Sequence, residues 1–487
     1  MSTLAIAFLA ILFCSVLLAK LGSRSSKGTE KSEELADFLL GSRTLGRSSV
    51  VNLLLSSSFG INAVFYAAWL GFTIGCWALL IQASWALSFF LLVPFAERFR
   101  GINSLHDFIG QRFDSTTRLL AAACSLVGIM FLVGWEVGIG KAAVASFMTA
   151  SDGASPESAA FTAELLIVGV VFGTLLYTFL GGLRGNAAAN ALLNLLKIVV
   201  ICALVFFSMH RLSTLENVSF IRSMFPSFET MRENLGLFGL ITNVLFNVTW
   251  QFVDNSSWQS IIAGSEHPNE KTSRNLRYSG LAIFLTIGVL GTLLGASLAH
   301  SPDVTPDNIL TMSVLALPEL QWLFTVGMMI VIIACMMSLI DGMLLASALT
   351  VSVDIASSFK RTAMLSSTAR LSVVRATLVI VAILSVWGID LVMRASGASL
   401  FDFVYIVIVT QLALTGPVVV GLVAKRDYKR PMWIPIALGL VVGFGSVIVG
   451  TMAEIPYLLE GAGTITILVS LTSAYSLSRR VTAATPP

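Results

Sequence analysis

The stretch Ser56-Ser57-Ser58-Phe59-Gly60-Ile61-Asn62 places polar residues and a glycine in the middle of an apolar run. A second apolar run is interrupted in the same way at Asn247-Val248-Thr249-Trp250-Gln251-Phe252-Val253-Asp254-Asn255-Ser256-Ser257. Unwound backbone at membrane depth exposes amide and carbonyl groups that an ion, a solute or water must satisfy. Two interrupted segments in corresponding halves therefore point to a transport site. The plainer interpretation is that these side chains only join neighbouring helices by hydrogen bonds.

Composition makes a membrane protein the only economical interpretation of the rest of the chain. The 487 residues are 56% hydrophobic and 12% charged, and the mean hydropathy is +0.87. A soluble surface needs about 25% charged residues. We therefore predict an all-α polytopic membrane protein and exclude a soluble enzyme, a nucleic-acid binder and a disordered chain. The five cysteines lie in apolar stretches without CxxC spacing, so neither a disulfide frame nor a metal site is expected.

Apolar runs of about 20 residues predict thirteen transmembrane helices. They lie near residues 3–19, 48–74, 76–96, 118–148, 161–180, 187–209, 235–263, 279–299, 323–350, 371–393, 401–423, 431–453 and 461–477. The interrupted segments are helices 2 and 7 of this series, five apart, so they would open two inverted five-helix repeats. We expect one membrane domain over 1–487, with core repeats at 48–209 and 235–423 and peripheral helices at 3–19, 431–453 and 461–477.

The positive charges predict the orientation of these helices. Of the 30 Lys and Arg residues, 24 fall on one side, four on the other and two inside helices. Because cytoplasmic loops are enriched in Lys and Arg, this bias predicts an N-terminus outside and a C-terminus in the cytoplasm. The first run lacks a preceding positive residue and is expected to remain attached rather than to act as a signal peptide.

Charged residues within the predicted spans are the next candidates, because burying a charge in the membrane is costly. They are Glu136, Lys141, Lys197, Asp254 and Asp341. Glu136 and Lys141 could pair with each other or with a neighbouring helix. The four histidines fall near predicted loops, and we expect them at the surface.

Four local motifs resemble those of the sodium/solute symporter family, which includes proline, pantothenate, sialic acid and sugar cotransporters. DFLLGSRTL (37–45) resembles the family's DFxLAGRxL, and LHDFIGQRF (105–113) is similar to its LPEFLxxRF loop. YTFLGGLR (177–184) is similar to YTxxGGLR, the most specific of the four. MSLID (337–341), followed by Val353-Asp354, resembles the MSTADS and RD pair. The similarity runs from about residue 35 to 430.

This resemblance implies a leucine-transporter type five-plus-five inverted repeat, alternating access and a sodium ion between helices 2 and 9. Carried over by position, the ion's ligands are backbone carbonyls near Ser56, Phe59 and Cys335 and the hydroxyl of Ser338. The family's second hydroxyl position is Leu339 here, and a family aspartate on the cytoplasmic sodium route is replaced by Asn190. These two departures remove one ligand and one carboxylate.

Lys197 offers a substitute for the ion. It follows Asn190 by seven residues, two helical turns on nearly the same face, which could bring its ammonium level with the predicted ion site. There it could act as a fixed charge or exchange a proton, as helix lysines do in sodium-independent transporters of the same architecture outside this family. The alternative is that Lys197 snorkels to the interface or pairs with Glu136.

Solute contacts are carried over from related sugar transporters. The matching positions are Ser58, Gln82 and Asp254, and Asn255 is a neighbouring candidate, with Gln259 and Trp258 beside it. Family members that bind neutral sugars carry an amide where Asp254 stands, so the carboxylate favours a cationic or amine-bearing solute, or a proton. Trp258 could equally be a packing aromatic.

These observations predict a secondary transporter in the cytoplasmic or plasma membrane that moves a small polar solute. The family resemblance favours sodium coupling, and the departures favour a proton-coupled or sodium-independent transporter with Lys197 in place of the ion. A transporter-like sensor is the rival from another class, although no signalling domain follows the last span. An enzyme is not expected, because no HExxH or other catalytic motif occurs. We expect no cofactor apart from the possible sodium ion, no nucleic acid and no obligatory protein partner.

Overall fold

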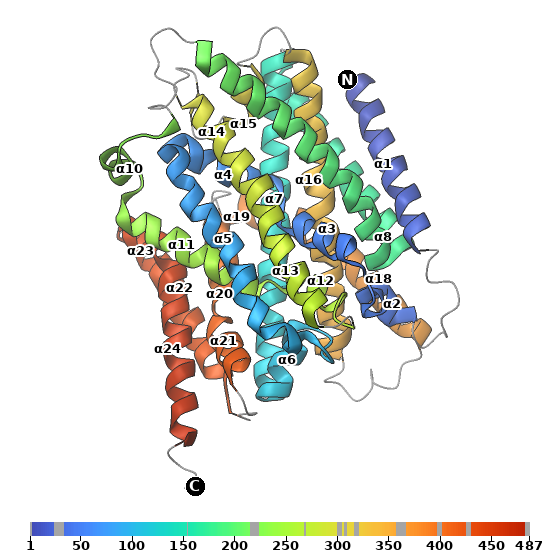
Figure 1. Cartoon of the computed structure of the whole chain (residues 1–487). Coiled ribbons are helices and arrows are strands. Elements are labelled where there is room, and N and C mark those ends of the chain that lie inside the picture. Colours follow the sequence, from blue (N-terminus) through green and yellow to red (C-terminus); the bar gives the residue numbers. More distant parts are fainter. Residues whose placement is uncertain are drawn as a thin grey trace.

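The computed structural model of the chain describes residues 2–23, 34–152, 154–214, 224–266, 269–299, 304–305, 309–315, 321–356, 367–396, 402–424 and 430–482. Within these ranges every regular element is a helix. Figure 1 shows the longest of them running side by side between the two ends of one bundle. The predicted all-α architecture is confirmed for this part of the chain.

The first half of the chain supplies the helices around the first interruption. They are α1 (Ser2–Ser23), α2 (Glu34–Leu40), α3 (Arg47–Ser58), α4 (Ile61–Ile74), α5 (Ala78–Leu92), α6 (Leu105–Arg112), α7 (Ser115–Asp152) and α8 (Pro156–Thr214). Short 3-10 turns occupy Gly41–Arg43, Gly75–Trp77 and Val93–Phe99. α8 holds two predicted spans and kinks between them at Gly182, where φ is +52°. A β-carbon at Gly182 would also lie 2.6 Å from the Phe38 carbonyl oxygen, so this junction requires glycine.

The second half repeats the pattern of a broken helix followed by long helices. Its helices are α10 (Phe228–Asn234), α11 (Gly236–Val253), α12 (Asn255–Ile262), α13 (Asn269–Ile283), α14 (Thr292–Leu298), α15 (Ile309–Leu315), α16 (Gln321–Leu349), α18 (Ser367–Ile383), α19 (Ile389–Ser396), α20 (Asp402–Leu412), α21 (Thr415–Val423), α22 (Trp433–Met452), α23 (Pro456–Glu460) and α24 (Ala462–Thr482). π-helical segments at Phe284–Gly291, Thr350–Ile355 and Leu384–Gly388 continue α13, α16 and α18.

Ten helical segments of the described chain are long and apolar enough to cross a membrane. Two of them, Ile61–Phe99 and Pro156–Ser213, extend over two predicted spans each. The last predicted span, 461–477, lies in α24, which is not among the ten. All thirteen predicted segments therefore coincide with helices or broken helices, and the chain is a multi-pass membrane protein.

Both interrupted stretches are breaks in a helix. α3 ends at Ser58 and α4 begins at Ile61, so the backbone leaves the helix at Phe59 and Gly60. α11 ends at Val253 and α12 begins at Asn255, with Asp254 in an extended conformation between them. α3 packs against α8, α12 and α16, which brings the two breaks to the same interior region of the bundle.

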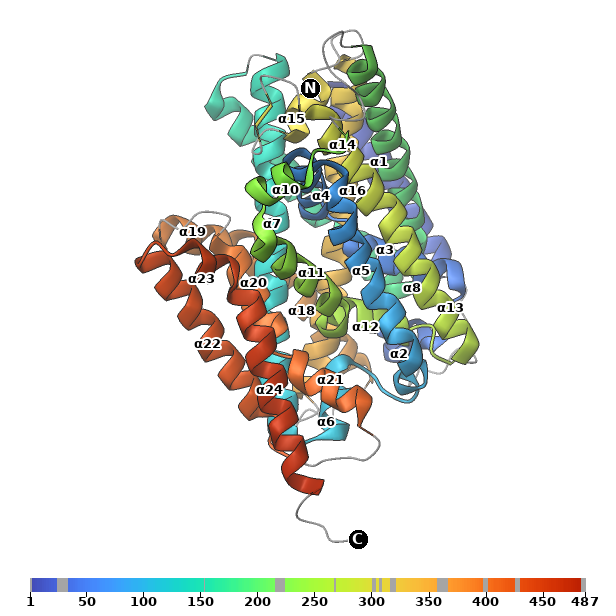
Figure 2. The same ribbon diagram turned by 60° about the vertical axis from the view of Figure 1, so that its left-hand side comes forward.

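The helices predicted to be peripheral lie at the edges of the bundle. α1 packs along α8, and α22 packs against α24. Figure 2 shows α22 and α24 on one side of the molecule and α1 on the other. α1 begins and α24 ends at opposite ends of the bundle in Figure 1.

Candidate functional site

The first break is capped by a carboxylate from another helix. The backbone N–H groups of Ile61 and Asn62, at the start of α4, donate to Glu136 Oε1 and Oε2 at 2.6 and 3.0 Å. Glu136 lies on α7 and is fully buried. Because the first N–H groups of a helix have no partner within it and carry a partial positive charge, this is the place where a buried carboxylate is most stable. Neither sequence alternative for Glu136 identified this role.

Lys197 of α8 lies at the predicted cation site. Its Nζ donates to the Phe59 carbonyl oxygen at 3.1 Å and to Ser338 Oγ at 2.9 Å. The Ser338 hydroxyl in turn donates to the Cys335 carbonyl at 3.2 Å. The ammonium also lies over the Phe59 ring, 4.6 Å from its centroid, a distance at which a cation is attracted to an aromatic face. Lys197 is fully buried, so the snorkelling alternative does not hold in this structure.

The predicted sodium ligands thus surround an ammonium. Phe59 and Ser338 contact it directly, and Cys335 contacts it through Ser338. Ser56 is engaged elsewhere, since its carbonyl accepts from Phe59 N at 3.2 Å and its hydroxyl donates to Asn194 at 3.2 Å. With Nζ seated between two of the four expected oxygens, the residues present do not fit a sodium ion at the same position.

Leu339 fills the place where the family carries a second hydroxyl. A β-carbon added to Gly60 would lie 2.5 Å from Leu339 Cδ1, so the leucine side chain packs directly onto the break. The Leu339 side chain is almost fully buried. An apolar methyl group therefore lies beside the Phe59 and Gly60 backbone, and it contributes no oxygen ligand.

Asn190 faces a carboxylate from α16. Its amide nitrogen lies 3.3 Å from Asp341 Oδ1, and the Tyr177 hydroxyl lies 2.8 Å from Asp341 Oδ2. The Asn190 side-chain oxygen has no partner among the described residues. A carboxylate is therefore present next to Asn190, but it belongs to Asp341.

The second break is capped from within its own turn. Asp254 accepts hydrogen bonds from the backbone N–H groups of Ser256 and Ser257 at 3.2 and 3.1 Å and from both serine hydroxyls. Asp254 is therefore the N-cap of α12. Its proposed contact with a solute stays a prediction, and in this structure its carboxylate is occupied by these serine donors.

Of the other predicted solute residues, Ser58 and Asn255 flank the two breaks, whereas Gln82 lies on α5 beside Gly288. Ser58 is the buried last residue of α3. Asn255 donates to Thr350 Oγ1 at 2.8 Å, and its own side-chain oxygen has no partner within the described part of the chain. Gln82 on α5 is 1% exposed, and both atoms of its amide lack a partner among the described residues. Since buried amides are nearly always hydrogen-bonded, Gln82 is a site at which a bound solute or water would be favourable.

Trp258 is a packing residue. Its ring lies 4.7 Å from that of Phe99 and 5.2 Å from that of Phe108, and its indole N–H donates to the Phe252 carbonyl at 2.9 Å. Gln259 donates to the Leu39 carbonyl at 2.7 Å. Both side chains therefore tie α12 to its neighbours.

The expectation for the histidines is wrong for His106. The loop predicted around it forms α6, and His106 is fully buried, with Nδ1 3.0 Å from Asp354 and Nε2 2.8 Å from Ser125. Arg118 also pairs with Asp354 at 2.8 Å. His210 is exposed as expected, whereas His267 and His300 lie outside the described residues. The motifs at 105–113 and 353–354 could have suggested this contact, because their polar residues meet here.

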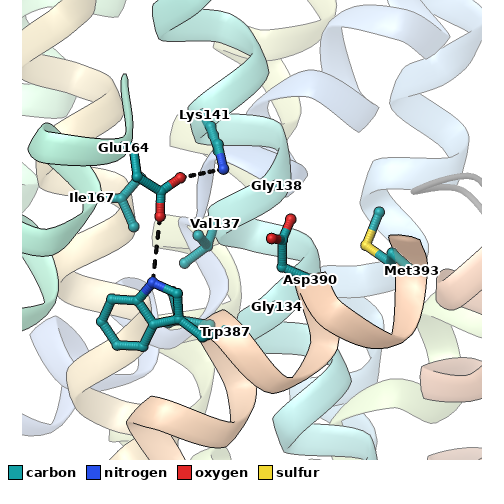
Figure 3. Close-up of a pocket in the computed structure, with 10 residues that line it drawn as sticks. Gly134, Val137, Gly138, Lys141, Glu164, Ile167, Trp387, Asp390 and Met393 are labelled. Carbon is teal, nitrogen blue, oxygen red and sulfur yellow. Dashed lines mark hydrogen bonds and ion pairs between the residues drawn. The ribbon is translucent and has the colours of Figure 1, made fainter. Parts of the chain in front are cut away.

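Lys141 pairs with a residue of a neighbouring helix and not with Glu136, the other partner that the sequence suggested. It forms an ion pair with Glu164 of α8, which also accepts from the Trp387 indole at 3.3 Å. Figure 3 shows Glu164 between these two side chains, at a small pocket between α7, α8 and α19. Asp390 lines the same pocket and pairs with Arg394 at 2.8 Å.

Comparisons with known proteins establish the fold. No family model and no curated protein matches the chain. The solved structure of a Na+-coupled sialic acid symporter in a substrate-bound, outward-open state matches with a TM-score of 0.71 and 16% identity, over 98% of this chain and 97% of that one. Mhp1, a nucleobase-cation-symport-1 family transporter with bound bromovinylhydantoin, gives 0.58 and 13%, over 92% and 95%. The Eremococcus coleocola manganese transporter in complex with a bis-isothiourea compound gives 0.56 and 15%, over 94% and 98%.

These likenesses cover nearly the whole of each chain, and all three neighbours are transporters by name. The chain has the leucine-transporter type fold that the family resemblance implied. At 13–16% identity the likeness concerns the fold, so membership of the sodium/solute symporter family stays a prediction.

Proposed function

We propose that the chain is a secondary transporter of the sodium/solute symporter type that moves a small polar solute by alternating access, with the Lys197 ammonium in place of the sodium ion. The observation that carries this proposal is the position of Nζ, 3.1 Å from the Phe59 carbonyl and 2.9 Å from Ser338 Oγ. It joins the first break to α16, the two elements between which the family resemblance implies the ion.

A fixed ammonium changes how the cycle is driven. A sodium ion enters and leaves with each turnover, whereas a lysine stays on its helix and can only change its contacts or its proton. Transport driven by a proton gradient, or by the solute gradient alone, follows from this arrangement. The buried carboxylates of Glu136 and Asp341 interact electrostatically with Lys197 and are candidates to exchange a proton with it.

Sodium coupling is the competing proposal. It is supported by the family resemblance and by the names of the neighbours, one described as Na+-coupled and one as a cation symporter. It requires the ion at another position, or Lys197 to leave its present contacts during the cycle.

For the solute we propose contacts with Ser58, Gln82 and Asn255, and with Asp254 only in a state in which it releases its serine donors. The unpartnered amide of Gln82 gives the best support among the four.

We also propose that the chain lies in a cell membrane in the orientation that the positive charges predict, with the N-terminus outside and the C-terminus in the cytoplasm.

The test measures the thermal midpoint of the purified protein in about 100 mM sodium chloride and in about 100 mM potassium chloride. An ion that binds the folded state raises this midpoint by mass action. We expect no sodium-specific shift for the wild type or Lys197→Arg. The double variant Lys197→Met with Leu339→Ser removes the ammonium and restores a hydroxyl oxygen at the predicted ion site. If sodium binds this variant with a Kd of about 10 mM, about 100 mM sodium should raise its free energy of unfolding by about 1.4 kcal/mol.

Flux completes the test. In proteoliposomes, a solute found by a binding screen should be taken up without sodium, and Lys197→Met should abolish that uptake. Uptake by the wild type only with a sodium gradient, or full uptake by Lys197→Met, would overturn the lysine proposal. Binding without any flux would favour the sensor.

A further inference from the structure

The N-terminus of the half-helix α4 is occupied by the protein itself. In this fold, the N-termini of broken helices are the positions that attract anionic groups of a solute, because their N–H groups are free and the helix dipole is positive there. Here Glu136 places one carboxylate oxygen on each of the first two N–H groups, at 2.6 and 3.0 Å. The protein's own carboxylate thus stands where a solute carboxylate would bind.

The second broken helix is closed in the same manner. Asp254 accepts from the N–H groups of Ser256 and Ser257, the second and third residues of α12, and from both serine hydroxyls. Since a carboxylate has about four acceptor positions, these donors leave it little capacity for a solute. At each half-helix N-terminus, a carboxylate of the protein therefore already holds two of the N–H groups that a solute anion would use.

The buried charges around the breaks also disfavour a solute that carries a carboxylate. Buried near the two breaks are three carboxylates, from Glu136, Asp254 and Asp341, and one ammonium, from Lys197. A further carboxylate brought in by a solute would add a like charge in a region of low dielectric, where repulsion is strong.

Glu136 keeps acceptor capacity that a solute could use. Each of its oxygens accepts one hydrogen bond from α4, so about two acceptor positions remain. A β-carbon at Gly60 would lie 2.8 Å from Oε2. The same β-carbon would lie 2.5 Å from Leu339 Cδ1, so the leucine side chain fills this side of the break and a solute would have to displace it to reach Oε2.

From this geometry we infer that Glu136 is a specificity-determining residue that excludes carboxylate-bearing solutes and selects a solute presenting amine or other N–H donors. The inference rests on the proposed transport function and names the solute class for the same site. The Glu136 carboxylate would then occupy the place that the carboxylate of an amino acid or organic acid would otherwise take.

The first experiment uses acetate as the probe. The thermal midpoint of the wild type, Glu136→Ala and the control Glu164→Ala is measured in potassium acetate against potassium chloride. Glu164 pairs with Lys141 away from any helix start, so its variant should behave as the wild type. We expect a saturable rise with acetate for Glu136→Ala alone. If the Glu136→Ala protein can be purified in folded form only in the presence of acetate, that outcome also supports the inference.

An equal response of the wild type, or a Glu136→Ala variant that acetate neither stabilises nor recovers, would overturn the inference. This readout needs no flux. A protein that passes it but transports nothing contradicts the proposed transport function and leaves the role of Glu136 standing.

The second experiment tests the solute class on the wild type with matched pairs that differ by a carboxylate, agmatine with arginine and cadaverine with lysine. Stabilisation by the member without the carboxylate is expected. Stronger stabilisation by the carboxylate-bearing member would overturn the inference.

Discussion

The two broken helices solve the same physical problem by different means. At the first break, the groups that satisfy the exposed backbone come from two other helices, Glu136 from α7 and Lys197 from α8, and Ser338 of a third helix, α16, accepts from the Lys197 ammonium. At the second break, Asp254 and two serines of the same turn complete the cap. The first break therefore depends on how the helices are packed, and the second is stable within its own segment.

This difference indicates which break can respond to transport. A rearrangement of α7, α8 or α16 would change the partners of α4, whereas α12 would carry its cap with it. We expect the first break to be the element whose contacts change during alternating access, and the second to move as a preformed unit. Variants at the two breaks test this difference.

The largest effect is expected from the charges at the first break. Glu136→Gln and Lys197→Met should each destabilise the protein by about 3 kcal/mol, because each leaves the opposite buried charge less compensated. The double variant should lose less than the sum of the two, by about 1 kcal/mol or more. Thermal midpoints of the four proteins measure this coupling. Strict additivity would show that the two charges do not act together.

A smaller effect is expected from steric crowding at Gly60. Its β-carbon would lie 2.5 Å from Leu339 Cδ1 and 2.7 Å from Asn62 Oδ1, so Gly60→Ala should cost about 2 kcal/mol. Leu339→Ala in the same chain should restore part of that loss. Gly342→Ala is the matched control, since its β-carbon would meet only Ser57 Cβ at 3.8 Å, and it should be neutral or slightly stabilising. Equal losses at both glycines would refute the crowding.

The smallest effect is expected at the second break. Asp254→Ala removes the N-cap of α12 and should cost about 1 kcal/mol, while Asp254→Asn keeps an acceptor and should cost less than half of that. Thermal midpoints in detergent, measured with and without a bound solute, test this. If Asp254→Ala were as stable as the wild type but bound no solute, Asp254 would be a solute contact rather than a cap.

Much of the architecture followed from hydropathy and polar interruptions. Thirteen apolar segments coincide with helices, and the breaks occur where polar residues enter two apolar runs. These features are local, because a helix that spans lipid must satisfy its own backbone. Of the four predicted cation ligands, Phe59 and Ser338 contact the ammonium of Lys197 and Cys335 accepts from Ser338, whereas Ser56 is bonded elsewhere.

Other features were decided by packing. Glu136 lies 75 residues after the N–H of Ile61 that it binds, and no local pattern links such distant positions. His106 was expected at the surface because its loop is polar, yet α6 packs against α7 and closes it against Asp354. Lys141 had two possible partners by sequence, and the approach of α8 selected Glu164.

Hydropathy and residue order were enough to predict a multi-pass helical bundle with two broken helices, because the free energy of burying backbone and apolar side chains in lipid depends on composition and local order. Which charged group meets which helix end became apparent from the packing of the helices alone. Those contacts join residues far apart in the chain, and their stability depends on distances of about 3 Å that helix packing alone sets.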